Sequence, residues 1–284
     1  MIKLVECPRD AIQGWPHPVP TGKKVEYLQA LLKVGFDTID FGSFVSPKAI
    51  PQMADTAEVF EQLDLSVSSS KLLAIVANRK GAEQACRYTQ INYLGYPFSV
   101  SETFQERNTN SNIAESFNLV KEMLELASQH QKQLVVYISM GFGNPYGDPY
   151  SIDEVLLWIR KLVEAGVNII SLADTVGMAT PLQVYELSSQ VIDHFPSIET
   201  GLHLHASKNG WEEKVQAAMN AGCSRMDAAM KGIGGCPMAK DELVGNLDTE
   251  KLVEYLGAAG RCQPLNFEAL KEASLLASSI FSGK

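Results

Sequence analysis

Two histidines separated by one residue carry the strongest chemical signal in this sequence. His203 and His205 lie in the run Gly-Leu-His-Leu-His, where other residues of the run are apolar or glycine. Alternation with a period of two is typical of a β-strand, and it places both imidazoles on the same face. Two imidazoles side by side are half of a site for a divalent metal ion. The other ligands must then come from elsewhere in the chain.

Asp10 is the best candidate for the third ligand, because it closely follows the strand expected at residues 3–7. One carboxylate and one more oxygen donor would complete the set and leave positions for water or substrate. The alternative is a pair of ordinary hydrogen-bonded histidines at the edge of a sheet. The coincidence with Asp10 favours the metal site, whereas His17, His130 and His194 have no such partner.

Length and composition limit the remaining choices. A chain of 284 residues with 45% hydrophobic residues is the size of one α/β barrel, so we expect a single domain over residues 1–284. The net charge of -9 argues against nonspecific binding to nucleic acid or to anionic membranes. Five widely spaced cysteines do not indicate a disulfide framework. With neither a signal segment nor a membrane-spanning run in view, we expect a cytoplasmic protein.

Short β-rich runs alternate with longer helical patterns along the whole chain, which is typical of βα units around a parallel sheet. Eight such rounds predict an α/β fold, a closed (β/α)8 TIM barrel. The expected strands are residues 3–7, 38–42, 72–77, 91–95, 134–140, 169–173, 201–205 and 225–230. The expected helices begin near residues 23, 54, 79, 112, 151, 181, 208 and 247, and an extra C-terminal helix is expected at 266–278.

The long non-periodic segments all follow strands, at residues 8–21, 98–109, 141–149 and 231–245. In a (β/α)8 barrel these loops gather at one mouth, where function resides. Charged side chains there need partners, and a divalent cation supplies one. The polar residues that we expect at this mouth are Arg9, Asp10, Asp40, Ser43, Glu102, Ser139, Asp174, His203 and His205.

A glycine-rich loop, Gly-Ile-Gly-Gly-Cys-Pro-Met-Ala at residues 232–239, forms the second constellation. Its glycines allow a close approach to a ligand, and Cys236 stands at their far end. The loop is either a mobile lid that carries a proton donor, a structural loop with a passive thiol, or a glycine nest for a phosphate. Its spacing does not choose among them.

Several longer motifs resemble the 3-hydroxy-3-methylglutaryl-CoA lyase family, within the metal-dependent pyruvate-carboxylase-like barrel superfamily. These motifs are Val-Glu-Cys-Pro-Arg-Asp-Ala-Ile-Gln at 5–13, Ser-Phe-Val-Ser-Pro-Lys at 43–48, Pro-Gln-Met at 51–53, His-Leu-His at 203–205, Gly-Ile-Gly-Gly-Cys-Pro at 232–237 and Gly-Asn-Leu at 245–247. The resemblance implies a TIM barrel that uses Mg²⁺ or Mn²⁺, with Zn²⁺ as a further candidate. It also implies an acyl-CoA substrate, cleaved to acetyl-CoA and acetoacetate.

The resemblance also implies roles for individual residues. It implies that Arg9 steadies the thioester oxygen as it becomes an enolate, that His203 also moves protons, and that Cys236 is a catalytic lid thiol. Asp40 matches a glutamate near the metal, and Asp174 matches an acid at the end of the sixth strand. The metal ligands that it implies are Asp10, His203, His205 and Asn246.

The sequence departs from the family pattern in three places near these residues. Ala11 replaces a glycine, Asp40 is shorter than the usual glutamate, and Ala206 replaces an aspartate. The loop Gly-Trp-Pro-His-Pro-Val-Pro at 14–20 replaces the family's Asn-Glu-Lys, near where the acyl-CoA of the family enters. Residues that contact metal ligands alter metal affinity or activity by about 10- to 100-fold. We therefore expect these changes to retune the enzyme rather than abolish its reaction.

Two further functions stay open at the level of sequence. One is a Claisen-condensing acyltransferase of the isopropylmalate or homocitrate synthase type, and the other is a noncatalytic metal-binding barrel. The lid-like loop and the end of the chain soon after the barrel favour the lyase over the synthase. The final helix and an apolar rim favour a homodimer, but no pattern in the sequence determines the number of subunits.

Overall fold

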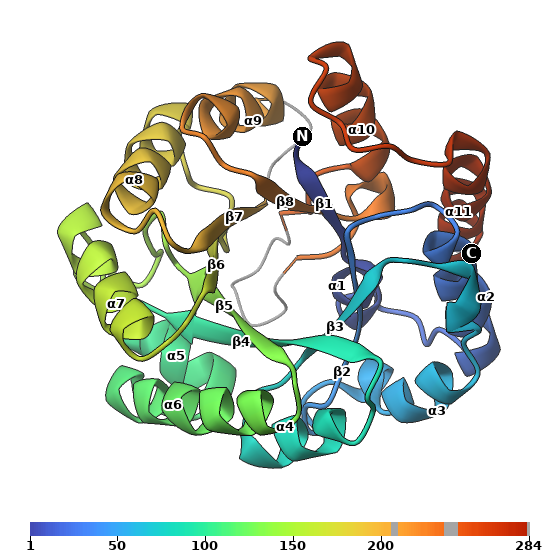
Figure 1. Ribbon diagram of the computed structural model, residues 1–284, viewed down its shortest axis with the longest axis horizontal. Helices are drawn as coiled ribbons and strands as arrows, with labels where there is room; N and C mark the ends of the chain where they lie inside the picture. Colours follow the sequence, from blue (N-terminus) through green and yellow to red (C-terminus); the bar gives the residue numbers. More distant parts are fainter. Residues whose placement is uncertain (206–209, 236–243, 283–284) are drawn as a thin grey trace.

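The computed structural model describes residues 1–205, 210–235 and 244–282. Within these ranges eight parallel strands follow one another around a closed barrel, and β8 pairs with β1 to complete it (Figure 1). The predicted (β/α)8 barrel is therefore confirmed. The strands are β1 (Lys3–Glu6), β2 (Thr38–Ser43), β3 (Lys71–Ile75), β4 (Ile91–Ser99), β5 (Gln133–Ser139), β6 (Ile169–Asp174), β7 (Glu199–Leu204) and β8 (Arg225–Ala228).

Helices surround the barrel and cover the outer faces of its strands (Figure 1). Helices begin close to all eight positions that the sequence predicts. The α-helices are α1 (Pro8–Gln13), α2 (Thr21–Leu32), α3 (Thr56–Glu61), α4 (Arg79–Cys86), α5 (Glu102–Thr109), α6 (Ile113–Gln129), α7 (Ile152–Glu164), α8 (Pro181–His194), α9 (Trp211–Asn220), α10 (Thr249–Ala258) and α11 (Phe267–Ile280). Three short 3-10 helices are η1 (Pro51–Met53), η2 (Leu65–Val67) and η3 (Met230–Gly232).

Two short helices, α1 and α5, lie in segments that the sequence pattern predicts to be irregular. Helix α1 has Pro8 at its first position. Proline is favoured there because the N–H of the first helical residue makes no hydrogen bond within the helix. Helix α5 is capped by Ser101, whose hydroxyl accepts the N–H of Phe104 at 3.2 Å. Both helices are too short for a helical period to be legible, so only their N-terminal residues signal them.

Strand β4 is longer than the predicted 91–95, because it continues through Pro97 to Ser99. The carbonyl of Gly95 accepts the N–H of Val76, so Gly95 and Pro97 turn their backbone toward β3. Strand β3 ends at Ile75, and the missing N–H of Pro97 therefore breaks no ladder bond. The extension brings the end of β4 level with the end of β5.

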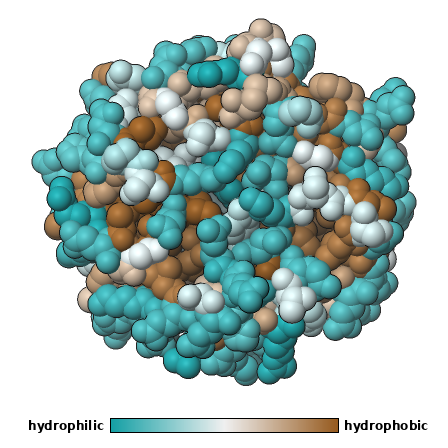
Figure 2. Space-filling view, in the orientation of Figure 1, coloured by the Kyte–Doolittle hydropathy of each residue, from teal (hydrophilic) through white to brown (hydrophobic). Residues whose placement is uncertain are grey.

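The predicted extra C-terminal helix is present as α11, and it packs against α2 on the outside of the barrel (Figure 1). Trp15, from the loop that follows α1, packs edge-on against Phe281 at 5.2 Å between ring centroids. In the view of Figure 2 hydrophilic residues dominate the rim, and apolar residues show between the helices. Among the described residues, no helix combines the length and apolar character needed to cross a bilayer.

Glu6 at the end of β1 is a buried acid that joins the barrel to the segment after β8. Its carboxyl oxygens accept the N–H of Met230 at 2.9 Å and the hydroxyl of Thr249 at 2.6 Å. Burial, which outweighs these two hydrogen bonds, raises the pKa of Glu6 from 4.5 to about 8. The folded protein therefore holds a proton on Glu6 that the unfolded chain has already released near neutral pH.

We expect Glu6→Gln to flatten the pH dependence of stability between pH 6 and 8. In this window the folded state binds one more proton than the unfolded state at this site, so the free energy of unfolding falls as pH rises. The slope from one such group is about 1.4 kcal/mol per pH unit, and glutamine removes it. Urea unfolding at several pH values measures the slope, with the exposed Glu26→Gln as control. Parallel curves for Glu6→Gln and the unsubstituted protein would contradict the shift.

Candidate metal centre and active site

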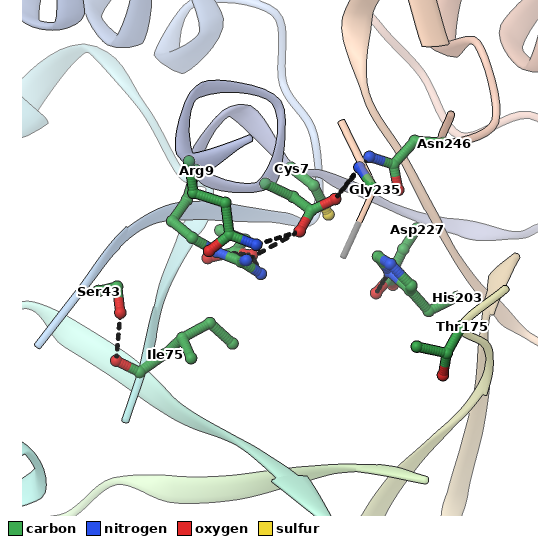
Figure 3. Close-up of polar contacts among 12 residues, drawn as sticks. Cys7, Arg9, Ser43, Ile75, Thr175, His203, Asp227, Gly235 and Asn246 are labelled. Atoms are coloured by element: carbon green, nitrogen blue, oxygen red, sulfur yellow. Dashed lines mark hydrogen bonds and ion pairs between the residues drawn. The ribbon is translucent and has the colours of Figure 1, made fainter. Parts of the chain in front are cut away.

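His203 of β7 and His205, which directly follows this strand, point their Nε2 atoms at each other across 3.1 Å. Nδ1 of His205 lies 2.8 Å from the carbonyl oxygen of Thr175, which can only accept, so Nδ1 carries the proton. Nδ1 of His203 lies 3.1 Å from a carboxylate oxygen of Asp227 (Figure 3). Both Nε2 atoms then present lone pairs to the same space. Two lone pairs this close repel each other unless a cation lies beside both, and this arrangement fits a metal site.

Asp10 from α1 completes a buried triad with the two histidines. One oxygen of Asp10 and one nitrogen of each imidazole lie within 4.8 Å of one another. Burial alone would raise the pKa of Asp10, but the charges of Arg9, His203 and His205 outweigh it and hold the pKa well below its usual range. Asp10 is therefore ionised at neutral pH. One carboxylate and two imidazoles are a donor set that suits a divalent cation.

The pKa values of the two histidines differ because their neighbours differ. Burial and then the adjacent His203 lower the pKa of His205 to about 4, so this ring is neutral at pH 7. Burial also works to lower the pKa of His203, but Asp227 and Asp10 outweigh it and raise the pKa. The neutral ring is the form that binds a metal, and His205 is already in it.

Asn246 and the glycines before Cys236 close over Asp10. The amide nitrogen of Asn246 donates to Oδ2 of Asp10 at 2.7 Å, and the N–H of Gly235 donates to the same oxygen at 3.2 Å (Figure 3). A Cβ on Gly234 would lie 2.3 Å from the amide nitrogen of Asn246, so only glycine fits there. The glycine-rich segment thus begins directly on the triad, and Asn246 has its amide oxygen left to offer as a ligand.

Arg9 joins Asp10 to Asp40 on β2. Its Nη1 donates to Asp10 at 2.9 Å, its Nε donates to Asp40 at 2.9 Å, and its Nη2 also contacts Asp40 (Figure 3). Burial raises the pKa of Asp40 to about 6 even though Arg9 opposes the shift. Asp40 is fully buried and orients the guanidinium, which faces the cavity described below. A fixed positive charge therefore lies beside the triad.

A cavity of about 390 Å³ opens at the carboxyl ends of the strands, and Arg9, Asp10, His203 and His205 line one side of it. The opposite side is formed by the segment after β2 and by α5. The remaining lining residues are Gln13, Ser43, Val45, Ser46, Ala49, Ile50, Ile75, Ala77, Asn78, Pro97, Phe104, Arg107, Asn108, Thr109, Asn110, Tyr137, Ser139, Ala173 and Thr175. A substrate with both apolar and polar parts fits such a lining.

Comparisons with known proteins agree with this geometry. The HMGL-like family model matches residues 2–276. The chain belongs to the HMGL-like family. Mitochondrial hydroxymethylglutaryl-CoA lyase of Mus musculus is 32% identical over 96% of this chain and 83% of its own length. The 3-hydroxy-3-isohexenylglutaryl-CoA/hydroxymethylglutaryl-CoA lyase of Pseudomonas aeruginosa is 32% identical over 96% of this chain and 90% of its own length.

A solved HMG-CoA lyase from Acinetobacter baumannii, in complex with coenzyme A and 3-methylmalate, has a TM-score of 0.91 and 33% identity. The match covers 99% of this chain and 92% of that one. The family resemblance predicted from the sequence is therefore confirmed, and these HMGL-like relatives are carbon–carbon lyases, the class that the sequence predicts.

Two acids that the sequence places at the mouth lie elsewhere in this HMGL-like barrel. Ala173 and Thr175 line the cavity, so strand alternation turns Asp174 to the outer face of β6, where it pairs with Lys214 of α9 at 2.8 Å. Glu102 begins α5 and accepts the N–H of Ile113 at 3.3 Å, outside the cavity. Neither acid reaches the triad.

The loop at residues 14–20, which is expected near the acyl-CoA entrance, is held against η1, and its place relative to an acyl-CoA stays a prediction. Trp15 and His17 are not among the described residues that line the cavity, and the side-chain amide of Gln52 holds both of their carbonyl groups. Cys236, the expected lid thiol, and Ala206 lie outside the described residues. Their expected positions stay predictions.

Sequence reasoning missed two residues of the site. Asp227 faces His203 because the two are partners in the β7–β8 register, and the alternation of residues along β8 could have indicated it. Arg107 lines the cavity and stacks on the Tyr146 ring at 4.6 Å between its guanidinium carbon and the ring centroid. Its position follows from α5, which the sequence pattern does not reveal.

Proposed function

We propose that this protein is a metal-dependent carbon–carbon lyase that cleaves 3-hydroxy-3-methylglutaryl-CoA, or a closely related 3-hydroxyacyl thioester, to acetyl-CoA and acetoacetate. The observation that carries the proposal is the triad of Asp10, His203 and His205 beside Arg9 on one cavity wall. In this retro-Claisen cleavage a tertiary hydroxyl loses its proton while the thioester oxygen gains negative charge. Both changes need positive charge that is already in place.

The proposed cofactor is Mg²⁺ or Mn²⁺, with Zn²⁺ as a third candidate. Asp10, His203, His205 and the amide oxygen of Asn246 would hold it, with the remaining positions open to water and substrate. When bound, the cation supplies the Lewis acidity that favours loss of the hydroxyl proton. Oxygen-rich completion of the site favours Mg²⁺ and Mn²⁺, which prefer oxygen ligands.

Four side chains of the site have proposed roles in stabilising charge and moving a proton. Arg9 faces the thioester oxygen and stabilises the enolate charge that develops there, while Asp40 holds the guanidinium in position. Nδ1 of His203 faces Asp227, so its metal-binding and proton-accepting roles both need Nε2, whose single lone pair serves one of them at a time. His203 would hold the cation through Nε2, and it would accept the hydroxyl proton there only when the cation does not occupy that lone pair. Asp227 then stabilises the positive charge that the proton brings.

An acyl-CoA is the proposed small-molecule partner, because the relative from Acinetobacter baumannii was solved with coenzyme A and 3-methylmalate. The apolar part of the lining, which includes Val45, Ile50 and Phe104, suits an acyl or pantetheine chain. The single domain over residues 1–284, the cytoplasmic location and the homodimer stay predictions from the sequence.

We expect Cys236→Ala to lower turnover by about 100-fold or more, because a positioned acid or base contributes a factor of this size. Gly235, which precedes Cys236 in the sequence, donates its N–H to Asp10. Mn²⁺ affinity should stay unchanged, since no proposed ligand is altered. Steady-state kinetics and calorimetry measure the two effects separately. Cys262→Ala is the matched control, and equal activity of both variants would make the lid thiol structural.

An assay with 3-hydroxy-3-methylglutaryl-CoA and Mg²⁺ or Mn²⁺ tests the proposed function. Release of acetoacetate and acetyl-CoA that stops on chelation of the metal would support the lyase. Condensation of an acyl-CoA with an oxoacid would favour the synthase type instead. Inactivity in both directions, with the metal bound, would favour a noncatalytic barrel.

A further inference from the structure

An arginine is buried inside the barrel, beneath the metal site. Arg225 of β8 is the largest side chain that is fully buried among the described residues. Its stem lies against Gly201 of β7, where a Cβ would come within 3.1 to 3.2 Å of the Cβ, Cγ and Cδ atoms of Arg225. Its guanidinium lies over the ring of Tyr93 at 5.6 Å from the centroid. TIM-barrel interiors are normally filled by aliphatic side chains, so this cation needs an explanation.

Arg225 belongs to a layer of the barrel directly below His203. Strand register joins Tyr137 to Ser171, Ser171 to Gly201, and Gly201 to Arg225. Two residues further along the same two strands, His203 pairs in register with Asp227. Because inward side chains recur every two residues, Arg225 and Asp227 face the same interior in successive layers.

This layer holds donors and acceptors that lack partners. One nitrogen of Arg225, Nη1, contacts Glu199 at 3.2 Å toward the amino end of the barrel. Its Nε and Nη2 have no hydrogen-bond partner among the described residues, and the same holds for Oδ1 of Asp227, the hydroxyl of Tyr137 and that of Ser171. Buried polar groups are nearly always paired, and groups like these commonly share an enclosed water.

Electrostatics also connects Arg225 with Asp227. Burial works to lower the pKa of Arg225, but the charge of Asp227, followed by those of Tyr137 and Glu199, outweighs it and raises the pKa. The guanidinium therefore stays charged. The only hydrogen bond that Asp227 makes with a described side chain engages His203, so its other oxygen can still accept from a donor, and Arg225, whose charge interacts with Asp227, has two N–H groups without a partner.

We propose that Arg225 is a positioning residue for the metal centre: through an enclosed water shared with Tyr137, it holds the free oxygen of Asp227 and so keeps Asp227 against Nδ1 of His203. The inference rests on the proposed function, because it gives Arg225 a role toward the same cation. A fixed Asp227 keeps the Nδ1 proton in place, and Nε2 of His203 is then presented to the cation. Arg225 touches neither the cation nor the substrate.

The alternative is that Arg225 acts only as a structural ion pair with Glu199. Glu199→Gln removes that ion pair and leaves Nε and Nη2 unchanged, so it is the matched control. Arg225→Met keeps an unbranched apolar stem and removes all the donors of the side chain. Arg225→Lys keeps the positive charge on a shorter side chain. We expect Arg225→Met to fold, because the replacement of a buried ion by an apolar residue is commonly tolerated.

Calorimetric titration with Mn²⁺ of the unsubstituted protein and the three variants is the test. We expect Arg225→Met to weaken Mn²⁺ binding by about 10- to 100-fold, the usual effect of removing a partner of a metal ligand. Arg225→Lys should restore part of the affinity, and Glu199→Gln should bind Mn²⁺ within about 3-fold of the unsubstituted protein. A crystal structure should also show a water that contacts Arg225, Asp227 and Tyr137.

Unchanged Mn²⁺ affinity in Arg225→Met would overturn the inference and leave the proposed function standing. Equal losses in Glu199→Gln and Arg225→Met would overturn it too, in favour of the ion pair. If Arg225→Met does not fold, the comparison of Arg225→Lys with Glu199→Gln decides in the same way. If the variants show the expected Mn²⁺ affinities but the unsubstituted protein does not cleave the thioester, the inference is supported and the proposed function is wrong. Failure of the unsubstituted protein to bind Mn²⁺ would overturn both.

Discussion

Asp10→Asn is expected to weaken Mn²⁺ binding by at least about 100-fold and to remove the cleavage activity with it. Asparagine keeps the shape of the side chain but removes the only negative charge of the proposed ligand set. Loss of a partner of a metal ligand alone costs about 10- to 100-fold, and loss of the charged ligand itself costs more. Calorimetric titration with Mn²⁺ measures the affinity, and acetoacetate release measures the activity.

Asp174→Asn is the matched control for this prediction. Asp174 is as deeply buried as Asp10 and also pairs with a cation, but it faces Lys214 on the outer side of β6. We expect this variant to lose stability while its Mn²⁺ affinity stays within about 3-fold of the unsubstituted protein, since Asp174 makes its contacts with Lys214 and Ala179 and with no ligand side chain. Normal Mn²⁺ binding by Asp10→Asn, or a large loss in Asp174→Asn, would place the metal elsewhere.

Arg9→Lys is expected to lower turnover by about 100- to 1000-fold, a larger factor than its loss of Mn²⁺ affinity. Lysine keeps the positive charge beside Asp10, but it lacks the fork that contacts Asp10 and Asp40 at the same time. The charge is then displaced from the oxygen of the developing enolate, and removal of one such donor costs a factor of this size. Single-turnover kinetics at saturating Mn²⁺ measure the chemical step.

The exposed Arg79→Lys, whose arginine pairs with Glu83 on α4, is the control for a general effect of the substitution. A second comparison uses Arg107→Lys, on the opposite side of the cavity, which should raise KM more than it lowers kcat. Turnover of Arg9→Lys close to that of Arg79→Lys would show that the guanidinium does not meet the reacting oxygen. A parallel loss of Mn²⁺ affinity would assign Arg9 to the support of Asp10 instead.

The fold and the triad could be predicted because their signals are local and periodic. The alternation around His203 and His205 sets a strand and a common face, and a closed barrel of parallel strands brings its loops to one mouth. Asp10 closely follows the first strand, so the barrel places it at the same mouth. The same reasoning placed Ser43 and Ser139 at the cavity, where the structure has them.

Side-chain direction at the ends of strands was the main limit. Asp174 ends β6 as expected, but the sequence alone does not tell which face it takes, and Lys214 from a distant helix decides it. Asp40 was expected near the metal shell, and it lies behind Arg9, whose guanidinium it orients. Both outcomes depend on tertiary partners that no local pattern contains. Asp227 and Arg225 were missed for the same reason, because their neighbours come from the adjacent strand β7.

Anomalous diffraction from crystals soaked in Mn²⁺ tests the central claim most directly. The account predicts one ion at the carboxyl end of the barrel, bound by an oxygen of Asp10 and by Nε2 of both His203 and His205, with the amide oxygen of Asn246 facing it. An anomalous peak at another site, or these three side chains turned apart with no ion between them, would contradict the account.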